Sequence, residues 1–219
     1  MNIAIDGPAG AGKSTIARLL AKKLGFIYVD TGALYRCMAL YYIRNNIDGS
    51  DAEKVAKCVD CIEVNLNYQN GAQHVFLNGE DVTDLIRTPK VSSMTSNVAV
   101  YPAVRERLLD TQRNIASEND VIMDGRDIGT NILPDAELKI YLTASIDSRA
   151  DRRYKELAQK GEDVNIDDIK ADIAERDERD KNRKTAPLRM AEDAVYVDSS
   201  DMSIDEVVEH IFNLAKARQ

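Results

Sequence analysis

Two spacings of apolar residues divide the chain into alternating segments. Short apolar runs rich in β-branched and aromatic residues predict buried strands, and they lie at residues 3–5, 26–30, 120–123, 138–144 and 194–198. Longer stretches with apolar residues three or four positions apart lie between these runs and predict amphipathic helices. Strands that alternate with helices favour an α/β fold.

A strict alternation of apolar and polar residues interrupts this order after the second run. The apolar members of the alternation are Ile62, Val64, Leu66, Val75 and Leu77. Asn-Gly pairs at residues 70–71 and 78–79 are turn signals. We expect a small antiparallel sheet here, inserted into the α/β chain, as a candidate subdomain on the substrate side. Two helices are expected to follow, one from Pro89 and one from Pro102.

A glycine-rich segment follows the first strand and precedes the first helix. Residues 7–14 match the pattern G-x-x-x-x-G-K-S. Glycine permits the backbone angles and the close approach that a loop needs to wrap its N–H groups around an anion. Lys13 supplies a mobile charge for the β- and γ-phosphate oxygens, and the Ser14 hydroxyl can bind Mg²⁺. Strand, glycine loop and helix together predict a phosphate-binding loop, and we weigh this against a glycine-rich turn that binds nothing.

Composition and charge narrow the classes of function. The chain has 219 residues and a net charge of −8, which argues against a non-specific nucleic-acid binder. A phosphate site must therefore be a local basic pocket. The first apolar run is too short for a signal peptide and no later run approaches a membrane span, so we expect a cytoplasmic protein with no membrane partner.

Three cysteines are present, at positions 37, 58 and 61. Cys58 and Cys61 form a C-x-x-C pair, but they lack the context of a redox motif, and His74 and His210 are the only histidines available to a zinc site. We interpret the cysteines as packed free thiols.

The third strand ends in the sequence D-G-R-D-I-G, with Asp124 at its tip and Asp127 three residues later. In a protein with a phosphate-binding loop, an acidic residue at the tip of an apolar strand approaches the Mg²⁺ shell. The alternative is a turn in which an aspartate caps the next helix.

The end of the second strand carries further candidates for ligand binding. We expect a helix over residues 33–46, preceded by Thr31 and carrying Tyr35 and Arg36 in its first turns. Ligands of open α/β sheets bind at such a strand end. A solvated Arg36 paired with a nearby acid is an equally good interpretation of position alone.

Residues 145–186 are the most charged part of the chain. Arg149, Arg152 and Arg153 share one helical face, where they repel unless an anion compensates them. Glu156 could compensate Arg152 within the helix, so a solvated, salt-bridged face is the alternative. We expect Gly161 to end this helix.

The following helix changes character along one face. Ile166, Ile169 and Ile173 form a stripe that continues, at the same spacing, as Arg176, Asp180 and Arg183. A helix that leaves the core and enters a wet cleft has this pattern, and a solvated end also fits it. We expect Pro187 to stop the helix.

Four stretches together resemble the bacterial cytidylate kinases, a family of P-loop nucleoside monophosphate kinases, over essentially the whole chain. The stretches are GPAGAGKST at residues 7–15, DTGALYR at 30–36, DGRDIG at 124–129 and RDERDKNRKTAP at 176–187. The first marks only the superfamily, and the last three are specific. The resemblance implies a doubly wound parallel sheet of about five strands with two mobile flaps. Its core would be residues 1–30, 117–146 and 187–219, its monophosphate-binding insertion residues 31–116, and its lid with the following helix residues 147–186.

The resemblance also implies roles for individual residues. ATP phosphates would bind Gly7, Pro8, Ala9, Gly10, Ala11, Gly12, Lys13, Ser14 and Thr15. The CMP phosphate would bind Arg36, Arg126 and Arg183. The cytosine would bind Ser96, Arg105 and Asp127. The sugar and the neighbouring phosphate would contact Arg176 and Asp180. Thr31, Tyr35 and Gly125 complete the predicted substrate site. The catalytic cations would be Lys13, Arg126, Arg149 and Arg153, and Mg²⁺ would bind Ser14 and, directly or through water, Asp124.

The chemistry of CMP agrees with these residue types. Cytosine presents an N4 amino donor where uracil presents an acceptor, so a carboxylate such as Asp127 favours cytosine. The acceptor phosphate is a dianion at neutral pH, so no side-chain base is needed. We expect ATP-dependent phosphorylation of CMP and dCMP by a monomer. The alternatives are a kinase for UMP or another small acceptor and a nucleotide-binding switch, although the N-K-x-D motif of GTPase switches is absent.

Overall fold

The computed structural model describes residues 1–69, 72–159 and 161–219. These residues form two compact units, which we describe separately. The first consists of Met1–Tyr28 and Asn119–Gln219, and the second of Val29–Glu118. Among the described residues, no helix combines the length and the apolar character that crossing a membrane requires.

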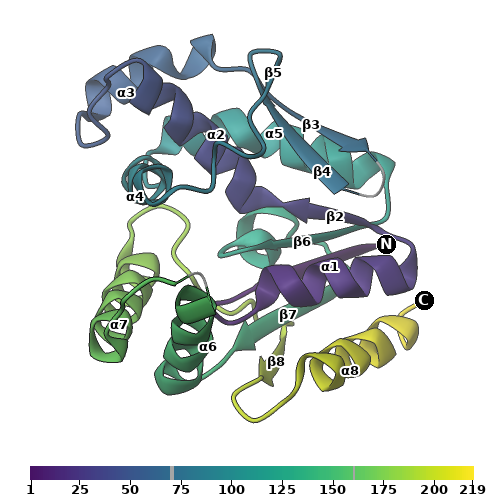
Figure 1. Ribbon diagram of the computed structural model, residues 1–219. Helices are drawn as coiled ribbons and strands as arrows, with labels where there is room; N and C mark the ends of the chain where they lie inside the picture. Colours follow the sequence, from purple (N-terminus) through teal and green to yellow (C-terminus); the bar gives the residue numbers. More distant parts are fainter. Residues whose placement is uncertain (70–71, 160) are drawn as a thin grey trace. The chain divides into compact units, whose positions relative to one another are not determined.

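A five-stranded sheet organises the first unit (Figure 1), in the order β2-β6-β1-β7-β8. Its strands are β1 (Asn2–Asp6), β2 (Ile27–Asp30), β6 (Val121–Gly125), β7 (Leu138–Thr143) and β8 (Val195–Asp198). Parallel pairing aligns Ile3 of β1 with Ile122 of β6 and with Leu138 of β7. The chain winds outward from β1 in both directions, so the carboxyl end of β1 lies at the switch point where ligands of such sheets bind.

Helices of the first unit bury their apolar faces in two clusters. α1 (Lys13–Leu24) and α8 (Ile204–Lys216) lie side by side and bury Ile16, Leu20 and Ile211 against the sheet (Figure 1). α6 (Ile146–Gln159) and α7 (Ile166–Asn182) form a second cluster through Ala150, Leu157, Ile169 and Ile173. A short π-helical turn, η2 (Ile128–Ile132), follows β6.

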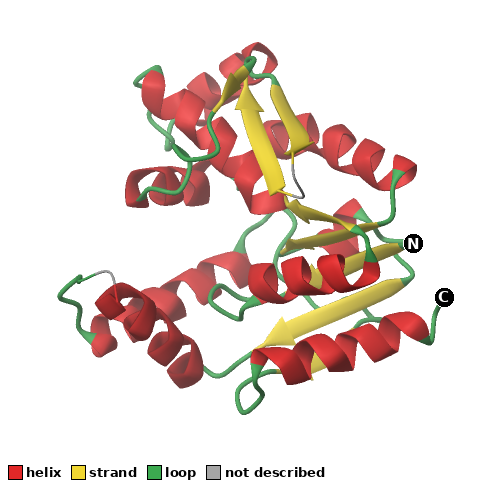
Figure 2. Ribbon diagram, turned by 45° about the vertical axis from the view of Figure 1, so that its right-hand side comes forward, coloured by secondary structure: helices red, strands yellow, loops and turns green. Residues whose placement is uncertain are grey.

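The second unit combines helices with a small antiparallel sheet (Figure 2) of order β3-β4-β5. Its elements are α2 (Thr31–Arg44), α3 (Ala52–Cys58), η1 (Val59–Cys61), β3 (Val64–Gln69), β4 (Ala72–Leu77), β5 (Glu80–Asp81), α4 (Pro89–Val98) and α5 (Pro102–Glu118). Leu34, Met38 and Tyr42 of α2 are fully buried in its core. Asn78 and Gly79 have φ angles of 49° and 85° and form the turn into β5. The turn expected at residues 70–71 lies outside the described residues.

The predicted fold class is confirmed: five parallel strands and a small antiparallel sheet are present. Two helix boundaries were wrong. α2 begins at Thr31 and not near residue 33, because Oδ1 of Asp30 accepts a hydrogen bond from the Ala33 N–H and caps the helix. α7 ends at Asn182, before Pro187, because Arg183 is already extended with ψ of 138°.

All three cysteines are free thiols, as expected, but the expectation that they are packed is wrong for Cys61, which is exposed, while Cys58 is partly buried. Cys37 is fully buried and burial raises the pKa of its thiol to about 12. It is therefore an apolar packing residue in the second unit and not a nucleophile.

Candidate functional site

The loop between β1 and α1 has the backbone that its glycines predict. Gly10 and Gly12 have φ angles of 77° and 87°, which L side chains rarely adopt. A Cβ atom on Gly7 would lie 1.9 Å from the carbonyl oxygen of Leu142 in β7, so no side chain fits there. Glycine is therefore required at Gly7 by close packing against the sheet and at the other two positions by backbone conformation.

Lys13 is buried at the end of this loop. Its Nζ donates a hydrogen bond to the Pro8 carbonyl over 2.8 Å. Burial first, and then the charge of Arg126, lower the pKa of the Lys13 ammonium to about 7, although Asp124 and Asp6 oppose the shift. A buried cation with so low a pKa is suited to receive an anionic ligand, whose charge would restore the usual pKa.

Asp124 is held by two hydroxyl groups. The Ser14 hydroxyl donates to Oδ2 and the Tyr28 hydroxyl donates to Oδ1, each over 2.8 Å. Asp124 is 6% exposed, so its carboxylate needs these partners. The Ser14 hydroxyl thus contacts the acid at the tip of β6, and the approach of Asp124 to Mg²⁺ stays a prediction. Asp127 directly precedes η2, but its side chain makes no capping hydrogen bond to that turn.

Asp6 fixes the turn that follows β6. Its two carboxylate oxygens accept hydrogen bonds from the N–H groups of Ile128 and Gly129 over 2.8 and 2.7 Å. Burial raises the pKa of Asp6 to about 6 because the two amides and Lys13 only partly offset the desolvation. These two hydrogen bonds therefore fix the position of the preceding residue, Asp127, relative to the end of β6.

Two arginine–aspartate pairs join this turn to the end of α7. Nε of Arg126 donates to Asp180 over 2.6 Å, and Nη2 of Arg183 donates to Asp127 over 3.0 Å. Burial would raise the pKa of Asp180, but Arg126, and after it Arg176 and Arg183, outweigh burial, so this pKa lies below its usual value. Four residues predicted for the substrate site thus come together from segments more than fifty positions apart.

The three arginines on α6 have separate partners. Arg149 makes a two-oxygen ion pair with Asp177 over 2.6 and 3.0 Å and also donates to the carbonyl of Ala9 in the loop. Arg152 donates to the Ser199 carbonyl over 2.6 Å. Glu156, expected to compensate Arg152, pairs with Arg153 over 2.8 Å.

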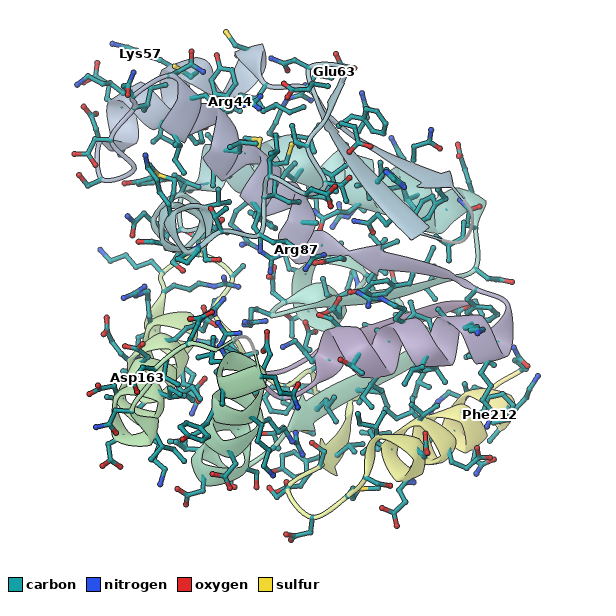
Figure 3. All side chains as sticks on the ribbon, viewed as in Figure 1. Arg44, Lys57, Glu63, Arg87, Asp163 and Phe212 are labelled. Atoms are coloured by element: carbon teal, nitrogen blue, oxygen red, sulfur yellow. The ribbon has the colours of Figure 1, made fainter. Side chains whose placement is uncertain are left out.

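In the second unit, two arginines approach one carboxylate. Nη2 of Arg87, a residue labelled in Figure 3, donates to Oδ2 of Asp30 over 3.0 Å. Nη1 of Arg36 lies 3.6 Å from the same oxygen. Nη1 of Arg36 is buried and has no hydrogen-bond partner within the described part of the chain. An unsatisfied buried donor of this kind favours binding of an anion near the start of α2.

Tyr35 and Arg105 of the second unit also lie together. The Arg105 guanidinium stands over the Tyr35 ring at 5.4 Å and donates to the Ala99 carbonyl over 3.3 Å. Ser96 donates to the carbonyl of Ser92 one turn earlier on α4. Thr31 is buried at the first position of α2.

Arg176 is exposed near the end of α7, and its charge helps to lower the pKa of both Lys13 and Asp180. Gly125 ends β6 and its carbonyl accepts a hydrogen bond from Arg126.

Three residues with clear contacts were missed by sequence reasoning, namely Tyr28, Arg87 and Asp177. Tyr28 was assigned only to a strand. Asp177 directly follows Arg176 in the last of the four matching stretches and lies four positions after Ile173, which places it on the buried face of α7. That spacing could have identified Asp177.

The residues around Ser14 can be tested for their fit to Mg²⁺. A hydroxyl and a carboxylate are hard oxygen ligands, and Mg²⁺ bound with nucleotides takes one or two protein ligands besides phosphates and water. No cluster of three or more histidine, cysteine or acidic residues that could hold a metal occurs in residues 1–69, 72–159 and 161–219. Ser14 and Asp124 therefore fit a nucleotide-bound Mg²⁺ and not a cage built from protein alone.

Comparison with known proteins places the chain in a family. A family model for cytidylate kinase matches residues 3–217. A cytidylate kinase from Caldicellulosiruptor bescii is 50% identical over 214 residues, which cover 98% of this chain and 95% of that protein. One from Ligilactobacillus salivarius is 47% identical over 218 residues, covering 100% and 97% of the two chains.

Among solved structures, an uncharacterized protein from Eubacterium ventriosum matches with a TM-score of 0.55 and 14% identity, covering 100% of this chain and 99% of that one. At this identity the match bears on the fold alone. The family model and the relatives extend over nearly all of the sequence, including all four stretches named above, and the chain therefore belongs to the cytidylate kinase family.

Proposed function

We propose that this chain transfers the γ-phosphoryl group of ATP to the phosphate of CMP or dCMP, giving ADP and CDP or dCDP. Membership of the cytidylate kinase family supports this reaction. The observation that carries the chemistry is the arrangement of Lys13 and Ser14 after the glycine loop, with Asp124 2.8 Å from the Ser14 hydroxyl. This arrangement can hold a polyphosphate and its metal ion at one place.

The donor site consists of the loop at residues 7–15. Its amide groups and the amino end of α1 bind the phosphates of ATP, and Lys13 lies against the β- and γ-phosphates. Arg153 on α6 closes over the same phosphates when its exposed pair with Glu156 opens, since such a pair is worth only about 0–1 kcal/mol. Arg149 contacts the loop itself.

Mg²⁺ is the expected cofactor. Ser14 would bind it through the hydroxyl oxygen and Asp124 through its carboxylate or a water. When bound with ATP, the ion neutralises charge on the transferred phosphoryl group.

Three arginines are assigned to the phosphate of the acceptor nucleotide. Arg36, Arg126 and Arg183 bind the CMP phosphate, and the unsatisfied Nη1 of Arg36 supports this role. Asp180 and Asp127 now pair with Arg126 and Arg183, so the phosphate must share or replace these carboxylates. Arg176 and Asp180 contact the sugar, which would make them sensitive to the 2′-hydroxyl.

Recognition of cytosine is assigned to a second set of residues, Ser96, Arg105 and Asp127. The Asp127 carboxylate accepts from the N4 amino group, and Ser96 and Arg105 donate to the N3 and O2 acceptors. Thr31, Tyr35 and Gly125 complete the surroundings of CMP.

The reaction needs alignment and positive charge, with no side-chain base. The second pKa of the CMP phosphate is near 6, so the acceptor is already a dianionic nucleophile at neutral pH. Lys13 and Arg126 hold donor and acceptor oxygens in line and stabilise charge as the phosphoryl group moves. Exclusion of water by the flaps would prevent wasteful hydrolysis of ATP.

We propose the division into a core at residues 1–30, 117–146 and 187–219, a monophosphate-binding insertion at 31–116 and a lid with its following helix at 147–186. We also propose a monomer that works in the cytoplasm, where both nucleotides occur, and binds no nucleic acid, in keeping with its net charge of −8.

The test is ADP formation from ATP and Mg²⁺ with one acceptor at a time: CMP, dCMP, UMP, AMP and a sugar with a free hydroxyl. We expect CMP and dCMP to support turnover far above the others. Equal turnover with UMP or with a hydroxyl acceptor would assign another kinase activity. Slow hydrolysis that no acceptor changes would indicate a nucleotide-binding switch.

A further inference from the structure

Two carbonyl groups of the donor loop point at cations. The Pro8 carbonyl accepts from Lys13 over 2.8 Å, and the Ala9 carbonyl accepts from Nη1 of Arg149 over 2.9 Å. In a trans peptide the N–H of the next residue points the opposite way from the carbonyl. Holding the Ala9 carbonyl against Arg149 therefore directs the Gly10 N–H away from α6, and the donor loop depends on the direction of such amides.

Arg149 is itself rigidly held. Nε donates to the Ala144 carbonyl over 2.9 Å, and Nη1 and Nη2 donate to the two oxygens of Asp177 over 3.0 and 2.6 Å. The Arg149 side chain is 4% exposed and that of Asp177 is 11% exposed. A planar guanidinium bound at both carboxylate oxygens has one orientation, and Asp177 supplies that constraint.

Packing adds to these hydrogen bonds. A Cβ atom on Gly10 would lie 3.5 Å from the Cβ of Arg149, so the arginine side chain lies directly against the loop. Gly10 has a φ of 77°, a backbone conformation that glycine adopts readily and other residues rarely do.

We propose that Asp177 is a positioning residue for the donor-phosphate loop. Its carboxylate holds Arg149 at the Ala9 carbonyl, and Arg149 in turn sets the direction of the Gly10 amide that binds a phosphate oxygen. Asp177 acts on ATP without touching it, and this role rests on the proposed function only in naming ATP as the ligand of the loop.

A purely structural role makes a different prediction. If Asp177 only joined α7 to α6, its substitution would lower the stability of the protein and weaken the binding of both nucleotides alike. If the loop is no longer held in position, the binding of the donor nucleotide is weakened selectively, because CMP binding is assigned to other residues.

The test compares Asp177→Asn, which keeps the shape and removes the charge, with Asp172→Asn, which changes an exposed aspartate on the same helix. Calorimetry measures the affinity for ADP and for CMP separately, in EDTA. In Asp177→Asn we expect the Kd for ADP to rise on the order of tenfold and that for CMP to change by less than about twofold. In Asp172→Asn we expect both to match the wild type.

Unchanged ADP affinity in Asp177→Asn, or an equal loss for ADP and CMP, would overturn the proposal. If Asp177→Asn does not fold, Asp177→Glu keeps the charge and displaces it by one methylene, and the same selective loss for ADP is expected. Arg149→Lys should weaken the binding of ADP to a similar extent. The double variant, which also carries Asp177→Asn, should bind ADP only slightly more weakly than Arg149→Lys alone. A wild-type chain that binds ADP but never phosphorylates CMP would contradict the proposed function, and the ADP comparison would still decide the role of Asp177.

Discussion

The hydroxyl of Ser14, at the start of α1, donates a hydrogen bond to Asp124, at the tip of β6, over 2.8 Å. The donated proton leaves the lone pairs of the serine oxygen available to a cation. The second oxygen of Asp124 accepts from Tyr28, so the carboxylate cannot rotate freely. We therefore expect Tyr28 to orient Asp124 for the proposed Mg²⁺.

Tyr28→Phe should raise the Mg²⁺ concentration needed for half-maximal activity by a few-fold to about tenfold, because outer partners of metal ligands typically matter to this extent. The measurement is initial rate against Mg²⁺ at saturating CMP. Tyr196→Phe removes a hydroxyl from an exposed tyrosine and serves as the control. An identical Mg²⁺ dependence in Tyr28→Phe and wild type would show that Tyr28 does not orient Asp124.

Lys13→Ala should reduce kcat by at least about 10²–10³-fold, the usual effect of removing one preorganised donor from developing charge. The same change frees the Pro8 carbonyl, so part of the loss would arise from the loop. Lys13→Arg keeps a positive charge in place of the ammonium and should retain more activity than Lys13→Ala. Full activity of Lys13→Ala would show that Lys13 does not take part in catalysis.

Local patterns were sufficient for most of the fold. Short, mostly apolar runs identified all five strands of the parallel sheet, because buried parallel strands are largely apolar on both faces. Alternation identified the antiparallel sheet for the opposite reason, since one face of it is polar. Helix ends were less certain, because a single cap such as Asp30 can move a boundary by two residues.

Contacts between residues far apart in the sequence could not be predicted from these local patterns. The stripe on α7 was followed from Ile173 to Arg176, three positions on, but the structure buries Asp177, four positions on. Both spacings lie on one helical face, so the pattern alone cannot choose between them. Asp177 is buried because it pairs with Arg149 on α6, and the local sequence of α7 does not show where Arg149 lies.

Asp127→Asn should narrow the preference for CMP over UMP, because an amide can present either a donor or an acceptor to the base. The structure adds that Asp127 accepts from Arg183 and from Asn131, so some loss of affinity for both nucleotides is also expected. The ratio of kcat/KM for CMP and UMP measures the effect, with the exposed Asp135→Asn as control. If that ratio does not move, Asp127 does not recognise the base.

Arg36→Ala should raise the KM for CMP far more than the KM for ATP, because it removes a buried N–H donor that has no hydrogen-bond partner among the described residues. Arg44→Ala is a matched control, because Arg44 (labelled in Figure 3) lies at the other end of α2 and pairs with the exposed Glu80. Arg44→Ala should leave both KM values near those of the wild type. Equal increases in the two KM values of Arg36→Ala would exclude it as a ligand of the monophosphate.

ADP binding should take up a proton at pH 8. The pKa of Lys13 is lowered to about 7 in the free protein, so most of its amino groups are neutral at pH 8. A bound phosphate favours the charged form and raises this pKa, so affinity should fall as pH rises above 7 and should level off below it. The phosphate of ADP is already ionised at pH 8 and the pKa of Asp6 is about 6, so neither accounts for the proton.

Calorimetry of ADP binding in EDTA, in buffers with different ionisation enthalpies, gives the number of protons taken up. We expect a value approaching one at pH 8 and close to zero at pH 6 from this lysine, with a slope of affinity on pH of at most about tenfold per unit. Lys13→Arg should bind ADP without the uptake, because a guanidinium stays charged throughout this range. If the wild type and Lys13→Arg take up the same number of protons at pH 8, the proton does not reside on Lys13.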